Sequence, residues 1–192
     1  MRPIVLLAVF FLAPGLNAQT MDWKGTFRGP PGRLDPRMAY DVARQQVVLF
    51  GGFLFGDLQT YPNSYFTDTW LWGGEQWDLA KSATPPHGRE GYAMAYDAAR
   101  REIVLFGGRR QYQGVNAWEF YWVTYGDTWV WDGRAWTSRK PIVSPGARAG
   151  HLMAYDAARQ RVVLVGGGDA HTWLWDGKNW NKANPSTPPP VQ

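Results

Sequence analysis

One pattern of apolar and polar positions occurs three times along this 192-residue chain. Each occurrence starts with Met-Ala-Tyr-Asp, continues through a polar turn into a short apolar run, and ends in two glycines. The three copies start at Met38, Met94 and Met153. Self-similarity of this kind indicates a repeat architecture in which each copy is one supersecondary unit.

Each copy predicts four short strands. The first is Met-Ala-Tyr-Asp, and the second is the apolar run, whose nearly continuous apolar residues indicate burial on both faces. The third carries two Trp residues two positions apart, which places them on one face. Asp132-Gly133 and Asp176-Gly177 are hairpin signals between the third and fourth strands, and Gly73-Gly74 takes that place in the first copy. A single Trp opens each fourth strand: Trp77, Trp136 and Trp180.

No segment between these strands has helical periodicity, so the chain is predicted to be all-β. The double glycine after an apolar strand, followed by an aromatic pair and a lone Trp, resembles the kelch repeat over roughly residues 33–180. The resemblance implies a β-propeller whose function is set by its loops and not by the repeat. The expected fold is a kelch-type β-propeller with three four-stranded antiparallel blades. The expected boundaries are a signal peptide at 1–18, an N-terminal segment at 19–32 with a leftover strand near Trp23, blades at 33–80, 81–138 and 139–181, and a Pro-rich tail at 182–192.

Three blades predict a partial propeller, because propellers close with about four to eight. Such an arc would expose an apolar sheet face at each end. Three alternatives remain open at this point. Two chains could join head to tail as a homodimer that closes a six-bladed ring, the chain could be a truncated piece of a longer propeller, or another protein could supply the missing blades.

The amino terminus predicts export. Arg2 precedes an apolar run at 4–13 and a small residue at Ala18, which is typical of a secretory signal peptide cleaved after Ala18. The run is about half of the ~20 residues that a membrane-spanning helix needs, so no membrane span is expected after cleavage. The chain contains no Cys, which excludes disulfides and thiolate metal sites. A secreted or periplasmic location follows.

Charge and motifs argue against several functional classes. The 20 basic and 16 acidic residues are scattered, and nucleic-acid binding usually needs a concentrated basic stripe, so no nucleic-acid partner is expected. The three His residues occupy different repeat positions without metal-ligand spacing, so no metal or other cofactor is predicted. Some kelch propellers are copper oxidases with a Tyr–Cys cofactor, which a chain without Cys cannot form. No catalytic residue is predicted, and the chain is expected not to be an enzyme.

The irregular segments are the candidates for binding. The inserts at 53–67 and 109–126 separate the double glycine from the third strand and are rich in aromatic residues. An up-and-down blade would place them on one face with the Arg that precedes each first strand. Aromatic rings and guanidinium groups together can hold sugars, carboxylates or peptides. The predicted ligand-binding residues are Arg33, Arg89, Arg148, Tyr65, Trp118 and Trp122.

The functional hypothesis is therefore a secreted, non-catalytic kelch-repeat module that binds a protein, peptide or glycan through this face. The alternative is a truncated fragment of a larger secreted propeller enzyme, such as a hydrolase, lyase or oxidase, whose catalytic blades are missing. The Asp and Arg that follow each first strand, such as Asp41 and Arg44, recur in every copy and are predicted to shape the turn.

Overall fold

The structure is a computed structural model, and it describes residues 29–56, 63–116 and 119–183. The expected signal peptide, the strand near Trp23, Trp118 and nearly all of the Pro-rich tail lie outside these residues. Within them the regular structure is all β-strand, as predicted, and no helix is long and apolar enough to cross a membrane.

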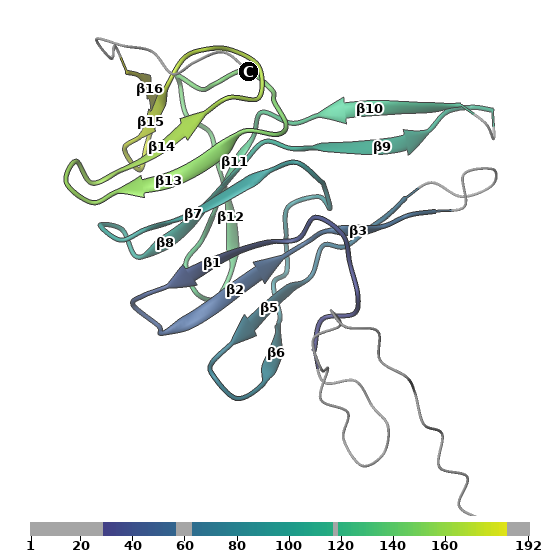
Figure 1. Ribbon diagram of the computed structural model, residues 1–192, viewed down its shortest axis with the longest axis horizontal. Coiled ribbons are helices and arrows are strands. Elements are labelled where there is room, and N and C mark those ends of the chain that lie inside the picture. Colours follow the sequence, from purple (N-terminus) through teal and green to yellow (C-terminus); the bar gives the residue numbers. More distant parts are fainter. Residues whose placement is uncertain (1–28, 57–62, 117–118, 184–192) are drawn as a thin grey trace, which may run out of the picture.

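Twelve of the sixteen described strands form three four-stranded antiparallel sheets, each built from strands in chain order (Figure 1). The first sheet contains β1 (Arg37–Asp41), β2 (Gln46–Phe50), β5 (Thr69–Trp72) and β6 (Trp77–Ala80). The second contains β7 (Ala93–Asp97), β8 (Glu102–Phe106), β11 (Thr128–Trp131) and β12 (Trp136–Arg139). The third contains β13 (Leu152–Asp156), β14 (Arg161–Val165), β15 (Trp173–Trp175) and β16 (Trp180–Lys182). The predicted antiparallel four-stranded sheets are thus confirmed.

The two aromatic inserts are themselves β-hairpins, which the sequence analysis did not predict. The first insert pairs β3 (Phe53–Leu54) with β4 (Ser64–Tyr65), and the second pairs β9 (Arg109–Gln113) with β10 (Phe120–Thr124). Figure 1 shows both hairpins leaving the same side of the stacked sheets.

The repeated Asp and Arg close the turn after each first strand, as predicted. Asp41 accepts a hydrogen bond from the Arg44 amide at 3.2 Å and pairs with the Arg44 guanidinium at 2.8 Å. Gln45 follows with a φ of 53°, a left-handed conformation that the closed turn imposes on a residue other than Gly. The turns at Asp97–Arg100 and Asp156–Arg159 have the same ion pair.

Strand alternation gives each sheet two different faces. The front face is defined in the second sheet by Met94, Tyr96, Ile103, Leu105 and Trp136, and in the other sheets by the equivalent positions. The back face is the opposite one, defined in the first sheet by Ala39, Val48, Phe50 and Leu71, and in the other sheets by the equivalent positions. The back face of the first sheet packs on the front face of the second in one buried cluster. The back face of the second packs on the front face of the third in another. The first strands β1, β7 and β13 lie beside one another along the stack.

In the second and third sheets, a Trp at the start of the fourth strand links the sheet to the one before it. Trp136 is buried, and its Nε1 donates to Thr69 Oγ1 of the first sheet at 2.8 Å. Trp180 is also buried and donates to Thr128 Oγ1 of the second sheet at 3.0 Å. Each interface therefore satisfies the indole N–H while it removes a large apolar surface from water, a burial that contributes ~2–3 kcal/mol for a side chain of this size.

Candidate functional site

The β9–β10 hairpin is fixed to the second sheet at its base. Gly107 and Gly108 follow β8 with φ values of 64° and 96°, a conformation that glycine adopts without strain. Arg109 and Glu90 exchange two backbone hydrogen bonds of 2.8 Å, and the Tyr125 amide donates to the Gly108 carbonyl at 2.7 Å. The double glycine thus turns the chain out of the sheet and into the hairpin.

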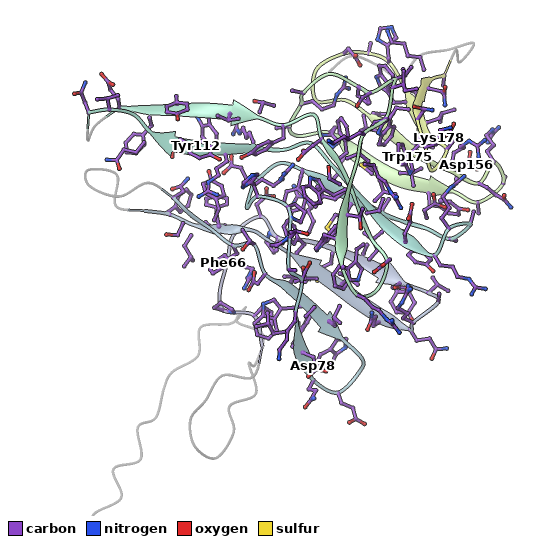
Figure 2. All side chains as sticks on the ribbon, turned by 180° about the vertical axis from the view of Figure 1, so that it is seen from behind. Phe66, Asp78, Tyr112, Asp156, Trp175 and Lys178 are labelled. Atoms are coloured by element: carbon purple, nitrogen blue, oxygen red, sulfur yellow. The ribbon has the colours of Figure 1, made fainter. Side chains whose placement is uncertain are left out.

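The two hairpins lie side by side. The Gln111 amide of β9 donates to the Tyr65 hydroxyl of β4 at 3.1 Å. Burial raises the pKa of that hydroxyl, so it remains a neutral acceptor. Figure 2 shows Tyr112 on the hairpin that projects from the sheets, with Phe66 closer to them. Residues from both inserts can therefore contribute to one surface.

Two arginines at the start of β9 stack on aromatic rings of these hairpins. The Arg110 guanidinium carbon lies 5.2 Å from the centre of the Tyr65 ring and 5.1 Å from that of Tyr112. The Arg109 guanidinium carbon lies 4.2 Å from the centre of the Trp122 ring. Tyr112 in turn stacks on Tyr121 across the hairpin, with centroids 5.8 Å apart. We call the following residues the hairpin cluster: Tyr65, Arg109, Arg110, Tyr112, Tyr121 and Trp122.

The cluster has more cationic than anionic groups. Arg109 Nε pairs with Glu90 at 3.0 Å, and its side chain remains 47% exposed. Arg110 has no ion pair with an acid of the described chain, and its buried Nε has no hydrogen-bond partner there. Tyr121 and Trp122 are 52% and 43% exposed. One face of the hairpin therefore presents the Tyr121 ring near the Arg110 guanidinium, which no carboxylate of the described residues neutralises. The other face presents the Trp122 ring beside Arg109.

A pair of tyrosines connects the hairpin cluster to the sheet stack. The hydroxyls of Tyr112 and Tyr125 lie 2.9 Å apart, and the Arg89 guanidinium carbon lies 4.1 Å from the centre of the Tyr125 ring. Burial, together with the hydrogen bond to Tyr112, raises the pKa of Tyr125. Tyr125 therefore connects an exposed hairpin to a buried arginine.

Arg33, Arg89 and Arg148 are not free to bind a ligand, which corrects the expectation for these three residues. Their side chains are at most 3% exposed, and each guanidinium holds an aspartate of its own repeat with two hydrogen bonds. The aspartates are Asp68, Asp127 and Asp169.

These pairs are structural for an electrostatic reason. Burial alone would raise the pKa of the Asp127 carboxyl, but hydrogen bonds from Arg89 and Trp129 outweigh burial and hold that pKa below its ordinary value. Arg89 also donates to the carbonyls of His87 and Gly107 at 2.9 Å. The guanidinium thus fastens the segment before β7 to the double glycine after β8.

The other predicted residues have different positions. Tyr65 and Trp122 belong to the hairpin cluster, whereas Trp118 lies outside the described residues. The prediction missed Arg109 and Arg110, although they form a rare basic pair directly after a double glycine. The sequence did contain a signal for a binding role of these two residues, because they lie between the aromatic segments of the two inserts.

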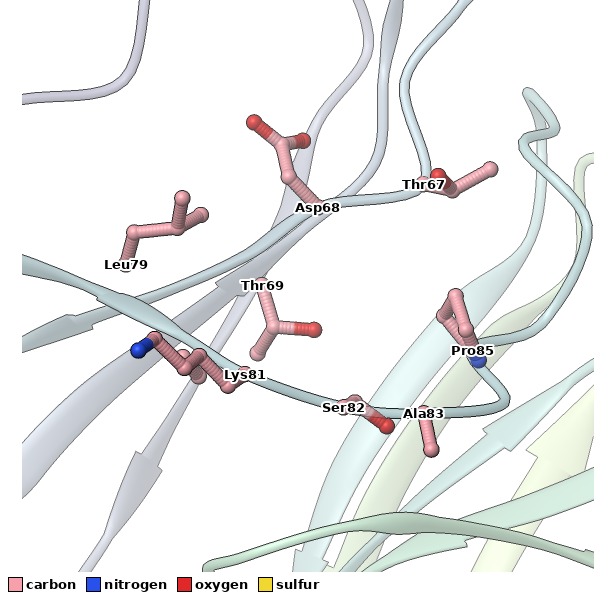
Figure 3. Close-up of a pocket in the computed structure, with 9 residues that line it drawn as sticks. Thr67, Asp68, Thr69, Leu79, Lys81, Ser82, Ala83 and Pro85 are labelled. Carbon is pink, nitrogen blue, oxygen red and sulfur yellow. The ribbon is translucent and has the colours of Figure 1, made fainter.

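An open groove of about 560 Å³ lies apart from this cluster, at the edge of the first sheet (Figure 3). Two of its polar groups are already engaged: Asp68 pairs with Arg33, and Thr69 accepts from Trp136. Figure 3 shows the side chains of Asp68 and Thr69 pointing to opposite sides of their strand. Among the described residues, no group of three or more His, Asp or Glu could hold a metal ion.

The comparisons with known proteins concern the fold alone. No protein-family model matches the sequence. A solved structure of the protein YjhT is similar to this chain, with a TM-score of 0.56 and 12% sequence identity. The similarity covers 83% of this chain and 48% of YjhT, so the chain spans about half the length of that structure. The repeated antiparallel sheets of this chain are compatible with a β-propeller architecture.

Proposed function

We propose that this chain is an exported kelch-type β-propeller unit of three blades that binds a carboxylate-bearing glycan through the hairpin cluster, without catalysing a reaction. The three stacked sheets would be the blades. The apolar run at 4–13 would be the export signal that directs the chain to the periplasm or the cell exterior.

Arg110 is the observation that carries the proposal. Its guanidinium is held between two tyrosine rings, yet no acid of the described chain pairs with it. The buried Arg89, by contrast, already holds an aspartate through two parallel hydrogen bonds. A guanidinium fixed in one orientation favours a carboxylate, because two N–H···O bonds form at little cost in side-chain entropy.

The aromatic residues favour a sugar as the carrier of that carboxylate. Trp122 is half exposed on β10, beside the Arg109 guanidinium. Tyr121 is half exposed on the other face of the hairpin, where it stacks on Tyr112 next to Arg110. Flat aromatic faces pack on the C–H surfaces of sugar rings, while guanidinium groups take the acidic substituents. A neutral polysaccharide would offer no carboxylate to pair with the Arg110 guanidinium. We therefore expect a preference for uronic-acid polymers.

Affinity electrophoresis through gels that contain polygalacturonate or neutral dextran tests the proposal. The wild-type protein should be retarded by polygalacturonate and not by dextran. R110M and Y121A, which alter the same face of the hairpin, should lose most of that retardation while they keep the wild-type melting temperature. R134M is the matched control, because Arg134 is an exposed arginine of the β11–β12 turn and its loss changes the net charge equally.

Equal loss of retardation in R110M and R134M would show nonspecific attraction to a polyanion and would contradict the proposal. Retardation by both polymers would contradict the role of Arg110 and leave the aromatic rings as the binding determinant.

A further inference from the structure

The two ends of the sheet stack have opposite faces uncovered by the described residues. On the front face of the first sheet, Met38 is 58% exposed, whereas its counterpart Met94 in the second sheet is 8% exposed. On the back face of the third sheet, Val163 is half-buried, whereas its counterpart Val104 is fully buried. Within the part of the chain that the structure describes, each face lacks the neighbour that covers the equivalent face elsewhere in the stack.

These two faces are the two halves of an interface that the chain already forms twice. Both internal interfaces join the back face of one sheet to the front face of the next. The free back face belongs to the third sheet and the free front face to the first, at opposite ends of the stack. We propose that two copies of this chain associate head to tail, with the third sheet of each copy packed on the first sheet of the other.

A specific arginine–glycine contact supports this occupant. Arg44 of the first sheet packs so closely over Gly133 of the second that a Cβ at Gly133 would collide with the Arg44 guanidinium. Arg100 of the second sheet covers Gly177 of the third in the same way. A guanidinium of one sheet thus lies over the third-to-fourth-strand turn of the next.

Among the described residues, one arginine and one glycine of this series have no counterpart from a neighbouring sheet. The Arg159 side chain is 73% exposed, against 36% for Arg44 and 29% for Arg100. Gly74, the counterpart of Gly133, has open space around the position of a Cβ. In a head-to-tail pair, Arg159 of one copy would cover Gly74 of the other.

The hydrogen bonds across the internal interfaces point to the same partner. The Tyr96 hydroxyl accepts from the Ala43 amide at 3.1 Å, and the Tyr155 hydroxyl accepts from the Ala99 amide at 3.0 Å. Tyr40 is their counterpart on the free front face, where its side chain is 52% exposed. Ala158 is the counterpart donor at the other end of the stack.

The hydrogen bonds that the indole N–H groups donate across the interfaces show the same pattern. Trp136 donates to Thr69, and Trp180 donates to Thr128, each across an interface. Trp77 and Thr172 are the corresponding donor and acceptor at the two ends. One contact would differ, because Pro36 replaces Tyr92 and His151 and offers no donor to the Val165 carbonyl.

The size of the similar fold is consistent with a closed pair. YjhT matches 83% of this chain with 48% of its own length, so the matched parts of two copies together have about the length of one such structure. Two identical head-to-tail contacts related by a two-fold axis would close the assembly and leave no free face. The proposal does not depend on what the hairpin cluster binds.

Light scattering on a sizing column tests the proposal with the full chain. The particle mass should be twice the single-chain mass that mass spectrometry gives for the same sample. M38K and V163E should each be folded and monomeric, because each buries an unpaired charge in both contacts of a pair. V115K is the matched control, because Val115 is fully exposed on the β9–β10 hairpin and far from both faces. It should remain dimeric.

Mixing the two monomeric variants separates head-to-tail closure from other dimers. A mixed pair has one unaltered contact and one in which the two substituted side chains, of opposite charge, face each other. M38K mixed with V163E should therefore recover the dimer, while neither variant does so alone. Far-ultraviolet circular dichroism of each variant checks that the sheets remain folded.

Three results would overturn the proposal. A monomeric wild-type chain at high micromolar concentration would mean that the faces are covered by another segment of the chain or by a different protein. A dimer that both variants leave intact would use another surface. An open-ended polymer would show the contact without the closure.

Discussion

Arg89 and Arg110 belong to the same repeat and have opposite environments. Arg89 is fully buried, stacks on Tyr125 and holds Asp127 with two hydrogen bonds. Arg110 lies between two tyrosine rings without an acidic partner in the described chain. The sheet stack uses its arginines to fasten backbone segments, whereas the hairpins hold theirs against aromatic rings with hydrogen-bonding capacity left over. The difference separates the residues that maintain the fold from those available to a ligand.

The largest expected effect is the loss of the buried pair. R89M should lower the free energy of unfolding by about 3–5 kcal/mol, towards the lower end because Asp127 is 33% exposed. Urea denaturation followed by Trp fluorescence measures this change. R110M, which leaves no carboxylate behind, should change it by less than ~1 kcal/mol.

A second variant shows whether the unpaired aspartate causes that loss. R89M combined with D127L removes both charges and should recover part of the stability, since an apolar pair of similar volume avoids the buried unpaired charge. If R89M and R110M destabilise equally, the two arginines do not differ in the way proposed here.

The next effect concerns His151, which occupies the position of Tyr92 one repeat later. Burial, followed by the nearby Arg148 charge, lowers the pKa of His151 from 6.5 to about 4. In the unfolded chain, His151 binds a proton as the pH falls below 6.5, whereas in the folded chain it stays neutral until about pH 4. The free energy of unfolding therefore decreases as the pH falls from 6.5 to about 4. The loss from this residue is on the order of 3 kcal/mol.

H151Y should remove this pH dependence. Tyr92 donates its hydroxyl to the Phe50 carbonyl at 2.5 Å, and His151 Nε2 donates to the Phe106 carbonyl at 3.1 Å, so Tyr can replace the bond without titrating in this range. Denaturation at pH 7 and pH 4.5 should show a smaller difference for the variant than for the wild type. An unchanged difference would assign the acid sensitivity to the aspartates instead.

The sheet stack could be predicted from the sequence because its determinants are local. The apolar run in β8 is buried at every position, and the turn at Asp41–Arg44 is closed by residues three apart. The Asp-Gly turns have the same character, since Gly133 takes a φ of 98° directly after the capping Asp132. Each signal lies within one or two strands, where sequence patterns carry most information.

The roles of the arginines could not be predicted in this way. Whether Arg89 faces solvent or Asp127 depends on a contact between residues 38 positions apart, on different sides of a hairpin. The β9–β10 hairpin was missed because β9 reads Arg-Arg-Gln-Tyr-Gln, without an apolar face to mark a strand. The recurrence of an Asp before the third strand of the first two repeats was the signal for the pairs, but the third repeat has His171 there and uses Asp169 instead.

The smallest effect tests the junction between the two regions. Y112F removes one hydroxyl of the Tyr112–Tyr125 pair, whose oxygens lie 2.9 Å apart, and should cost about 1 kcal/mol. Because Tyr125 also stacks on Arg89, this cost could fall on the hairpin alone or on the whole stack. We expect faster hydrogen exchange of the β9 and β10 amides with unchanged exchange in β8, since local opening needs only the hairpin contacts. Equal acceleration in β8 would mean that hairpin and stack unfold as one unit, and the proposed division between a structural and a binding region would then be wrong.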